Sequence, residues 1–257
     1  MASQVVAADL SKALALDEKP FLRAEEAWNG FYVGLAAGLS RNAIQGATLA
    51  SDGTTFARTV RESADERLRG ANGGLYLGVQ KQISPIFVMG VEGDFTRLGG
   101  KSLVADTVQS ANTWQGQTSA EISYRAAWLA TGRVRSGVVF GSVMPYLTGG
   151  VAFSSEHEKR TQYVGNSTTI LTEVSFVETD RKLRVGWSLG AGVEWRMSQA
   201  WSLRAEYLQA RFAGNVFKFP DARGGVVPTS GYLTVQGRLA NNRSRIDLGR
   251  VGISYYF

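Results

Sequence analysis

The chain has 257 residues, of which 44% are hydrophobic, with 30 glycines, 5 prolines and no cysteine. The lack of cysteine excludes disulfides, a thiolate nucleophile and a cysteine-ligated metal, and no uninterrupted apolar run reaches the ~18 residues of a transmembrane helix. The 28 basic and 22 acidic residues give a net charge of +6, which is compatible with a nucleic acid, an anionic lipid surface or a plain solvated surface.

Residues 1–27 lie before the first predicted strand. The stretch ASQVVAADL (residues 2–10) is typical of the end of a secretory signal, because small residues precede Ala8 and Asp9. The basic region and the full apolar region of such a signal are missing, which indicates a late start or a trimmed chain. We interpret residues 1–27 as a signal-peptide remnant followed by a polar arm.

Eight segments with period-2 alternation follow the arm, and each is predicted to be a β-strand. They are about 9–13 residues long, compared with ~5–6 residues for most strands of soluble proteins. A bilayer is crossed by tilted strands of ~9–11 residues. The predicted strands cover residues 31–39, 73–81, 87–95, 124–135, 145–153, 184–195, 201–212 and 245–257.

The two faces of these strands differ in character. One face carries large apolar side chains such as Leu75, Leu77 and Val79, whereas the other carries glycine, alanine, serine, threonine and a few charges of both signs. A soluble sandwich would place its large apolar face inward and a charge-rich face outward. A second face made of small side chains with few charges therefore favours a barrel whose apolar face contacts lipid.

The predicted connections alternate in length, which is typical of outer-membrane barrels with short periplasmic turns and long extracellular loops. Both termini are then expected on the periplasmic side. The short connections are 82–86, 136–144 and 197–200, and the long ones are 40–72, 96–123, 154–181 and 213–244. Alternation also continues in the third and fourth long connections, which predicts strand extensions above the membrane.

Three segments carry a resemblance to a known family: WNGFYVGL (28–35), MPYLTGGVAF (144–153) and RVGWSLGAGVEWRMSQAWSLRAEYL (184–208). They resemble the small outer-membrane β-barrel proteins of alphaproteobacteria, which are related to the membrane domain of OmpA. The resemblance covers residues 28–257 and is specific in the strands. It implies one all-β domain, an eight-stranded antiparallel transmembrane β-barrel, in the cell outer membrane of a Gram-negative bacterium.

The last segment, RVGISYYF (250–257), resembles the C-terminal signal that the barrel-assembly machinery reads. In that signal a polar residue, a glycine and two aromatic residues stand at fixed spacing, and Arg250, Gly252, Tyr255 and Phe257 occupy these positions. The resemblance implies that the final strand is recognised during assembly and closes against the first strand. The alternative is an ordinary terminal edge strand.

Charged residues gather on the face that points into the barrel. Buried charges are costly unless they are paired, so opposite signs are expected to form ion pairs. An eight-stranded barrel has a bore that side chains just fill, which favours a polar plug; the alternative is a charge-lined pore or proton path. The expected network comprises Glu92, Asp94, Arg133, Arg135, Glu194, Arg196, Arg204, Glu206 and Arg250, and Arg125 shares their face.

Two further features bear on function. His157 is the only histidine, and outer-membrane enzymes that modify lipid A use a histidine with serine and an acid; no such motif surrounds it, which favours a solvated loop residue. The long connections carry basic residues that could bind lipopolysaccharide phosphates or simply be solvated. These residues are Arg58, Arg61, Arg67, Arg69, Lys218, Arg223, Arg238, Arg243 and Arg245.

We therefore expect a non-enzymatic outer-membrane protein that supports envelope integrity and surface interaction. A narrow porin and a lipid A-modifying enzyme are the alternatives. Expected partners are outer-membrane lipids, lipopolysaccharide and the barrel-assembly machinery, with no nucleic acid, metal or cofactor. The resemblance also implies that Ala8 and Asp9, once freed by signal cleavage, can be joined to peptidoglycan.

Overall fold

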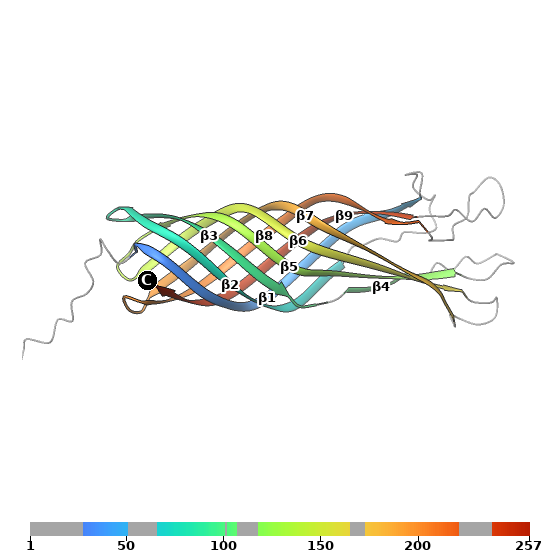
Figure 1. Cartoon of the computed structure of the whole chain (residues 1–257), viewed down its shortest axis with the longest axis horizontal. Coiled ribbons are helices and arrows are strands. Elements are labelled where there is room, and N and C mark those ends of the chain that lie inside the picture. The colour runs from blue at the N-terminus through green and yellow to red at the C-terminus, as the bar shows by residue number, and fades with distance from the viewer. Residues whose placement is uncertain (1–27, 51–65, 101, 107–117, 165–172, 221–237) are drawn as a thin grey trace, which may run out of the picture.

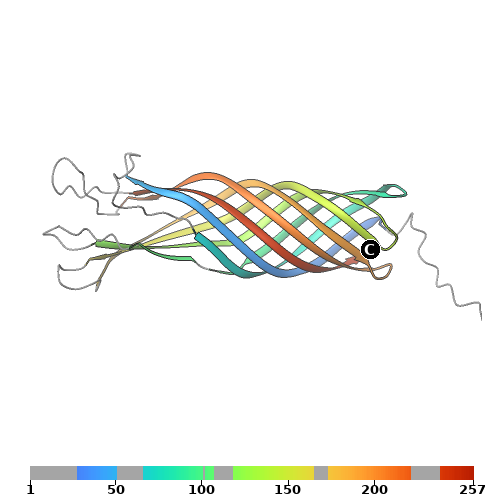
Figure 2. The same ribbon diagram turned by 180° about the vertical axis from the view of Figure 1, so that it is seen from behind.

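The computed structural model describes residues 28–50, 66–100, 102–106, 118–164, 173–220 and 238–257. Over these residues the chain forms an elongated barrel of strands joined by turns, as Figure 1 and, from behind, Figure 2 show. Among these residues we find no helix with the length and apolar character needed to cross a membrane.

Nine strand segments form one sheet. β3 and β4 both pair with β5, at residues 128–138 and 120–124 respectively, so together they act as one interrupted strand. The barrel therefore has eight strands, as the sequence predicts. The segments are β1 (Gly30–Ala50), β2 (Glu66–Ser84), β3 (Phe87–Leu98), β4 (Ser102–Asp106), β5 (Thr118–Val138), β6 (Val143–Val164), β7 (Glu173–Arg196), β8 (Trp201–Phe219) and β9 (Arg238–Tyr256).

The sheet closes on itself, and every pairing is antiparallel. β1 pairs with both β2 and β9, and β3 pairs with β5, so the described sheet closes into a barrel and these strands have partners on both sides. The strands are staggered, because a walk across the paired residues returns to β1 displaced along the strand. That walk runs from Tyr32 through Gly78, Glu92, Arg133, Gly150, Ser188, Ala210 and Ile246 to Asn42.

Most strands extend well beyond the length that a bilayer requires. β7 has 24 residues and β6 has 22, compared with the ~9–11 that span a membrane. The predicted extension of the third long connection is confirmed up to Val164 and from Glu173. The long connections are consequently shorter than predicted, since residues 40–50, 66–72, 118–123 and 213–219 continue the strands.

Large apolar side chains cover the outward face, as lipid exposure requires. Aromatic rings gather at both ends of this apolar belt. At the short-turn end, Tyr255 contacts Trp201 and Phe257, with ring centroids 5.1 Å apart in each pair. At the other end, the rings of Phe95 and Trp128 lie 5.7 Å apart. These two groups correspond to the aromatic girdles of membrane barrels.

The expected inward position of Arg125 is wrong. A β-bulge between Ala126 and Trp128 inserts one residue into β5 and reverses its alternation beyond that point. Tyr124 and Ala126 therefore point into the barrel, and Arg125 points outward beside His157.

Candidate functional site: the charged interior of the barrel

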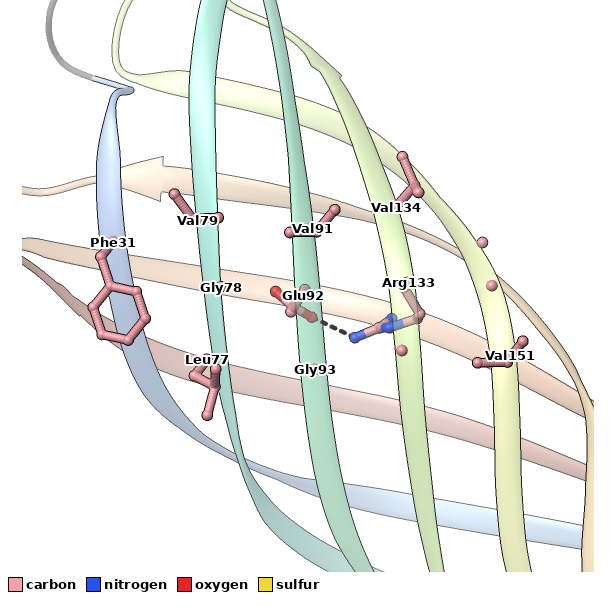
Figure 3. A pocket seen from close by; sticks show the side chains of 13 residues that line it. Phe31, Leu77, Gly78, Val79, Val91, Glu92, Gly93, Arg133, Val134 and Val151 are labelled. Carbon is pink, nitrogen blue, oxygen red and sulfur yellow. Dashed lines mark hydrogen bonds and ion pairs between the residues drawn. The ribbon is translucent and has the colours of Figure 1, made fainter.

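The central group of the interior consists of three arginines and three carboxylates, all buried. Arg133 contacts Glu92, lies 2.7 Å from Asp94 and donates to Glu206 at 3.1 Å. Figure 3 shows the contact between Glu92 and Arg133, which reach toward one another from adjacent strands. Each arginine offers five donors, so one guanidinium can satisfy several carboxylates.

Two further arginines complete this group. Arg250 lies 2.8 Å from Asp94 and 2.6 Å from Glu206, and Arg204 lies 2.5 Å from Glu92. Each of the three carboxylates thus contacts two guanidinium groups, and the six charges sum to zero. Burial of these charges in a narrow barrel is tolerable because each has opposite partners.

A second ion pair lies next to the first group. Arg135 contacts Glu194, whose other oxygen accepts hydrogen bonds from Ser202 at 2.5 Å and Tyr256 at 2.7 Å. The Arg135 guanidinium also lies 3.7 Å above the ring of Tyr146, which donates to Glu206 at 2.8 Å. Eight of the nine expected charges therefore form ion pairs that tyrosine joins into one network.

Arg196 is the ninth charge, and it meets this network through the ring of Tyr256, which donates to Glu194. Its guanidinium stacks 3.5 Å from the ring centroid of Tyr256 and 5.3 Å from that of Trp28. Trp28 is fully buried among Val88, Val139 and Met144. Arg196 and these apolar residues close the periplasmic end of the barrel.

Tyrosines link the network, and the sequence analysis did not identify them. Tyr32 donates to Glu92 at 2.8 Å, and Tyr76 shares a hydrogen bond of 2.7 Å with Ser254. Three inward tyrosines face glycine on the adjacent strand, in the pairs Tyr32–Gly78, Tyr76–Gly34 and Tyr146–Gly192. A Cβ on any of these glycines would lie within 2.6 Å of the tyrosine ring or hydroxyl. The glycine-rich inner face therefore makes room for these rings. In the sequence, these tyrosines could have been found because they occupy the same inward-pointing alternate positions as the charged residues.

An apolar layer lies further toward the extracellular end. Leu129, Leu208, Ile246 and Leu248 are fully buried, and Phe212 is nearly so. They belong to one contiguous cluster that also includes alanine side chains from several strands. Apolar side chains thus fill the bore directly above the charged network.

A second polar group lies beyond the apolar layer. Arg184 pairs with Glu156 at 2.8 Å and donates to the carbonyl oxygens of Ala213 and Asn242. The Asn242 amide donates to Glu158 at 2.8 Å. The sequence analysis missed Glu156, Glu158 and Asn242 because it treated 154–181 and 213–244 as connections. It also left out Arg184, although this residue begins the predicted strand 184–195 and shares the inward alternation of Glu194.

The side chains of this network mainly bind one another. The carboxylates of the network already accept hydrogen bonds from arginine, serine or tyrosine, which leaves them satisfied rather than directed at a substrate. No group of three or more histidine, aspartate or glutamate side chains suited to a metal is found in the described part of the chain. The interior therefore resembles a plug of ion pairs and hydrogen bonds.

A shallow groove of about 530 Å³ lies outside the network, on the lipid-facing wall. Figure 3 shows Leu77, Val79, Val91, Val134 and Val151 around it. The groove exists because outward glycines of β3, β5 and β6 carry no side chain there. Its apolar lining suits the hydrocarbon region of a membrane.

The residues of the expected assembly signal divide between the two faces. Arg250 and Gly252 point inward, and Tyr255 and Phe257 point outward. The predicted closure against the first strand is confirmed, because the Phe257 amide donates to the Phe31 carbonyl at 3.0 Å. Ala8 and Asp9 lie outside the described residues.

On the strands that the structure describes beside His157, arginines stand opposite it. Its Nε2 lies 3.2 Å from the Ser155 hydroxyl, but the residues opposite it on the flanking strands are Arg125 and Arg181. A triad histidine needs a carboxylate to orient it and to stabilise its protonated form. The two arginines instead oppose protonation of His157.

Comparison with known proteins agrees with this architecture. A family model described as "Outer membrane protein beta-barrel domain" matches residues 11–227. The 31 kDa outer-membrane immunogenic proteins of Brucella melitensis biotype 1 and Brucella suis biovar 1 are each 28% identical over 210 residues, which cover 81% of this chain and 79% of theirs.

Solved structures of outer-membrane proteins are also similar. OprG from Pseudomonas aeruginosa gives a TM-score of 0.45 at 12% identity, over 89% of this chain and 97% of that one. Neisserial surface protein A gives a TM-score of 0.39 at 13% identity, over 89% and 97%. The family model covers most of the chain, so the protein belongs to the family of outer-membrane β-barrel domains and resides in the outer membrane of a Gram-negative bacterium.

Proposed function

We propose that the protein is a non-enzymatic outer-membrane barrel with a closed interior, which supports envelope integrity and takes part in surface contacts. The observation that carries this proposal is the order of layers along the bore. A neutral ion-pair network is followed by an apolar layer and then by a second polar group. A continuous water path would have to cross the apolar layer, where polar side chains such as Ser40 and Asn42 are few.

The surface role is supported by the strand extensions and by the relatives. β6 and β7 pair over 22 and 24 residues, which carries them far beyond the apolar belt. The Brucella relatives are named as immunogenic outer-membrane proteins. A protein of this kind presents its long-loop end to the surroundings, and its barrel adds a rigid element to the outer membrane.

A deletion strain tests the envelope role. Loss of the protein is expected to increase sensitivity to detergent and to increase vesicle release, and expression of the wild-type chain is expected to restore both. A strain that behaves like its parent in both assays contradicts the envelope role. The same strain distinguishes the proposed role from that of a lipid A-modifying enzyme. Such an enzyme would change the lipid A mass spectrum, and His157→Ala would abolish that change.

The N-terminal arm is proposed to join the barrel to the cell wall through Ala8 and Asp9, which lie outside the described residues. About 20 extended residues can span up to ~60–70 Å at ~3.3–3.6 Å per residue. Muramidase digestion of purified sacculi is expected to release muropeptides that carry the N-terminal peptide. Complete removal of the protein from sacculi by hot detergent, with a free N-terminal amine in all copies, contradicts the tether.

A further inference from the structure

Positively charged residues lie directly opposite one another on the outer surface of the barrel. Arg41 of β1 faces Arg69 of β2, and Arg211 of β8 faces Arg245 of β9. All four side chains are exposed, and the residues that flank Arg41, Arg211 and Arg245 along their strands are buried. The four residues, here called the arginine cluster, span four neighbouring strands in the order β8, β9, β1 and β2.

The arginine cluster lies at the outer boundary of the apolar belt. Arg211 is paired in register with Trp187, and its guanidinium lies 5.4 Å from the indole ring centroid. Arg41 follows Leu39, which is 73% exposed on the same face. Tryptophan marks the level of lipid headgroups in membrane barrels. The arginines therefore meet the membrane at the depth of the outer-leaflet headgroups.

Among the side chains that the structure describes, the charge of the cluster is only partly compensated. Like charges directly opposite one another destabilise a strand pair. The carboxylate within the cluster is Asp247, which lies 3.0 Å from Arg245 and also accepts hydrogen bonds from Tyr207 at 2.7 Å and Gln209 at 3.1 Å. One carboxylate against four guanidinium groups leaves a local excess of positive charge.

Neighbouring side chains hold part of the cluster in place. Arg211 donates from Nε to the Gln209 amide oxygen at 2.7 Å, and Gln209 in turn binds Asp247. This hydrogen bond uses the Nε donor of Arg211 and does not involve its two terminal nitrogens. Guanidinium groups bind phosphate through two parallel hydrogen bonds, which suits terminal nitrogens that are held in one orientation.

A similar arrangement occurs on another part of the circumference. Arg125, His157 and Arg181 face one another across β5, β6 and β7. His157 lies four residues beyond Phe153 of the apolar belt, outside the membrane-spanning part. Partial burial, followed by the charges of Arg181 and Arg125, lowers the pKa of His157. Positive charge therefore recurs around the barrel at this boundary.

We propose that the arginine cluster binds phosphate groups of the phosphorylated glycolipid of the outer leaflet, lipopolysaccharide. Two cross-strand arginine pairs supply the hydrogen-bond donors. Their position beside Trp187 and Leu39 places these donors at the depth of the outer-leaflet headgroups. Only Arg69 and Arg245 of this cluster belong to the basic residues that the sequence analysis singled out. The proposal depends on outer-membrane placement and is independent of whether the interior is closed.

Binding of lipid A by the full-length folded protein tests this proposal. Native mass spectrometry from detergent would compare three added lipids: bisphosphorylated lipid A, the same lipid A with its phosphates removed, and phosphatidylglycerol. The wild type is expected to retain bisphosphorylated lipid A about tenfold better than either comparison lipid. Equal retention of dephosphorylated lipid A would show binding through acyl chains alone and would overturn the proposal, and equal retention of phosphatidylglycerol would overturn its specificity for glycolipid phosphate.

Variants place the binding site on the barrel. The two double variants Arg41→Gln with Arg69→Gln, and Arg211→Gln with Arg245→Gln, are each expected to lose most of this preference while keeping heat-modifiable mobility. Lys81→Gln is the matched control, because Lys81 is exposed on β2 near the short turns. Unchanged binding in both double variants, or an equal loss in the Lys81 control, would contradict the proposed site. Two separate pairs keep the test decisive if one of them fails to fold.

Discussion

At the scale of single residues, the barrel interior depends on arginine and on glycine. Arg133 contacts three carboxylates from two other strands, which a lysine ammonium could not match with the same planar geometry. Glycines opposite Tyr32, Tyr76 and Tyr146 leave the space in which these rings lie across the bore. The bore is narrow, so the charged side chains and the tyrosine rings fit into it together only because glycines face the rings.

Removal of Arg133 tests the plug at this scale. Arg133→Ala leaves Glu92, Asp94 and Glu206 with one guanidinium partner fewer in a buried site. Loss of one member of a buried ion pair costs about 3–5 kcal/mol, so urea unfolding of the detergent-refolded variant should occur at lower denaturant. Arg97→Ala is the control, because Arg97 is exposed on the outside of the same sheet. Equal stability of the two variants would contradict a structural network.

Lipid exposure is tested by a charge on the outward face of β7. Leu189 is 58% exposed below Trp187, and Leu183 is 64% exposed on the outer side of it. Leu189→Arg should cost about 2–4 kcal/mol near the middle of the bilayer, whereas Leu183→Arg should cost about 0–1 kcal/mol near its surface. The measurement is the free energy of unfolding from lipid vesicles. Equal costs at the two positions would contradict the assigned depth.

At the scale of strands, the sequence determines the membrane-spanning core more clearly than its ends. Alternation identifies the membrane-spanning part of all eight strands, because there one side of each strand faces lipid and the other faces a narrow bore. The ends are less evident, since residues such as Glu156 and Glu158 are polar whether they lie in a loop or in a strand above the membrane. The bulge at Ala126/Trp128 depends on pairing with β6, so local alternation cannot reveal it.

The interior partners show the same limit. Alternation along the strands places Glu92, Arg133 and Glu206 on the inward face, but it does not predict which of them are in contact. The contact between Arg133 and Glu206 joins residues that are 73 positions apart and depends on the stagger of the closed sheet. The expected network was therefore accessible as a set of residues, whereas its pairs and its tyrosine links required the three-dimensional register.

The terminal strand is tested by its last residue. Phe257 contacts the rings of Phe31 and Tyr255, at 5.6 Å and 5.1 Å between centroids. Phe257→Ala, or deletion of Phe257, should reduce heat-modifiable folded protein in the outer membrane of cells but leave refolding in detergent largely intact. Trp201→Ala is the control, since Trp201 contacts Tyr255 in the same girdle. Normal levels of the Phe257 variant in cells would contradict its role in recognition.

At the scale of the whole molecule, closure of the sheet and closure of the bore are separate properties. The sheet closes through the pairings of β1 with β9 and of β3 with β5, which satisfies the backbone in lipid. In the proposed closed interior, side chains fill the bore, with Arg196 and Trp28 at one end, the ion-pair network above them and the apolar layer beyond. The proposed role as a closed envelope protein rests on the second property.

Conductance across a planar lipid bilayer tests the closed interior most directly. The purified wild-type barrel, inserted at defined protein amounts, is expected to give no steady conductance steps. Truncation of the apolar layer in the double variant Leu208→Ala with Leu248→Ala, two fully buried side chains, should raise the frequency of transient openings relative to the wild type. Uniform, long-lived conductance steps from the wild-type protein, scaling with salt concentration, would contradict a closed interior and establish a narrow pore.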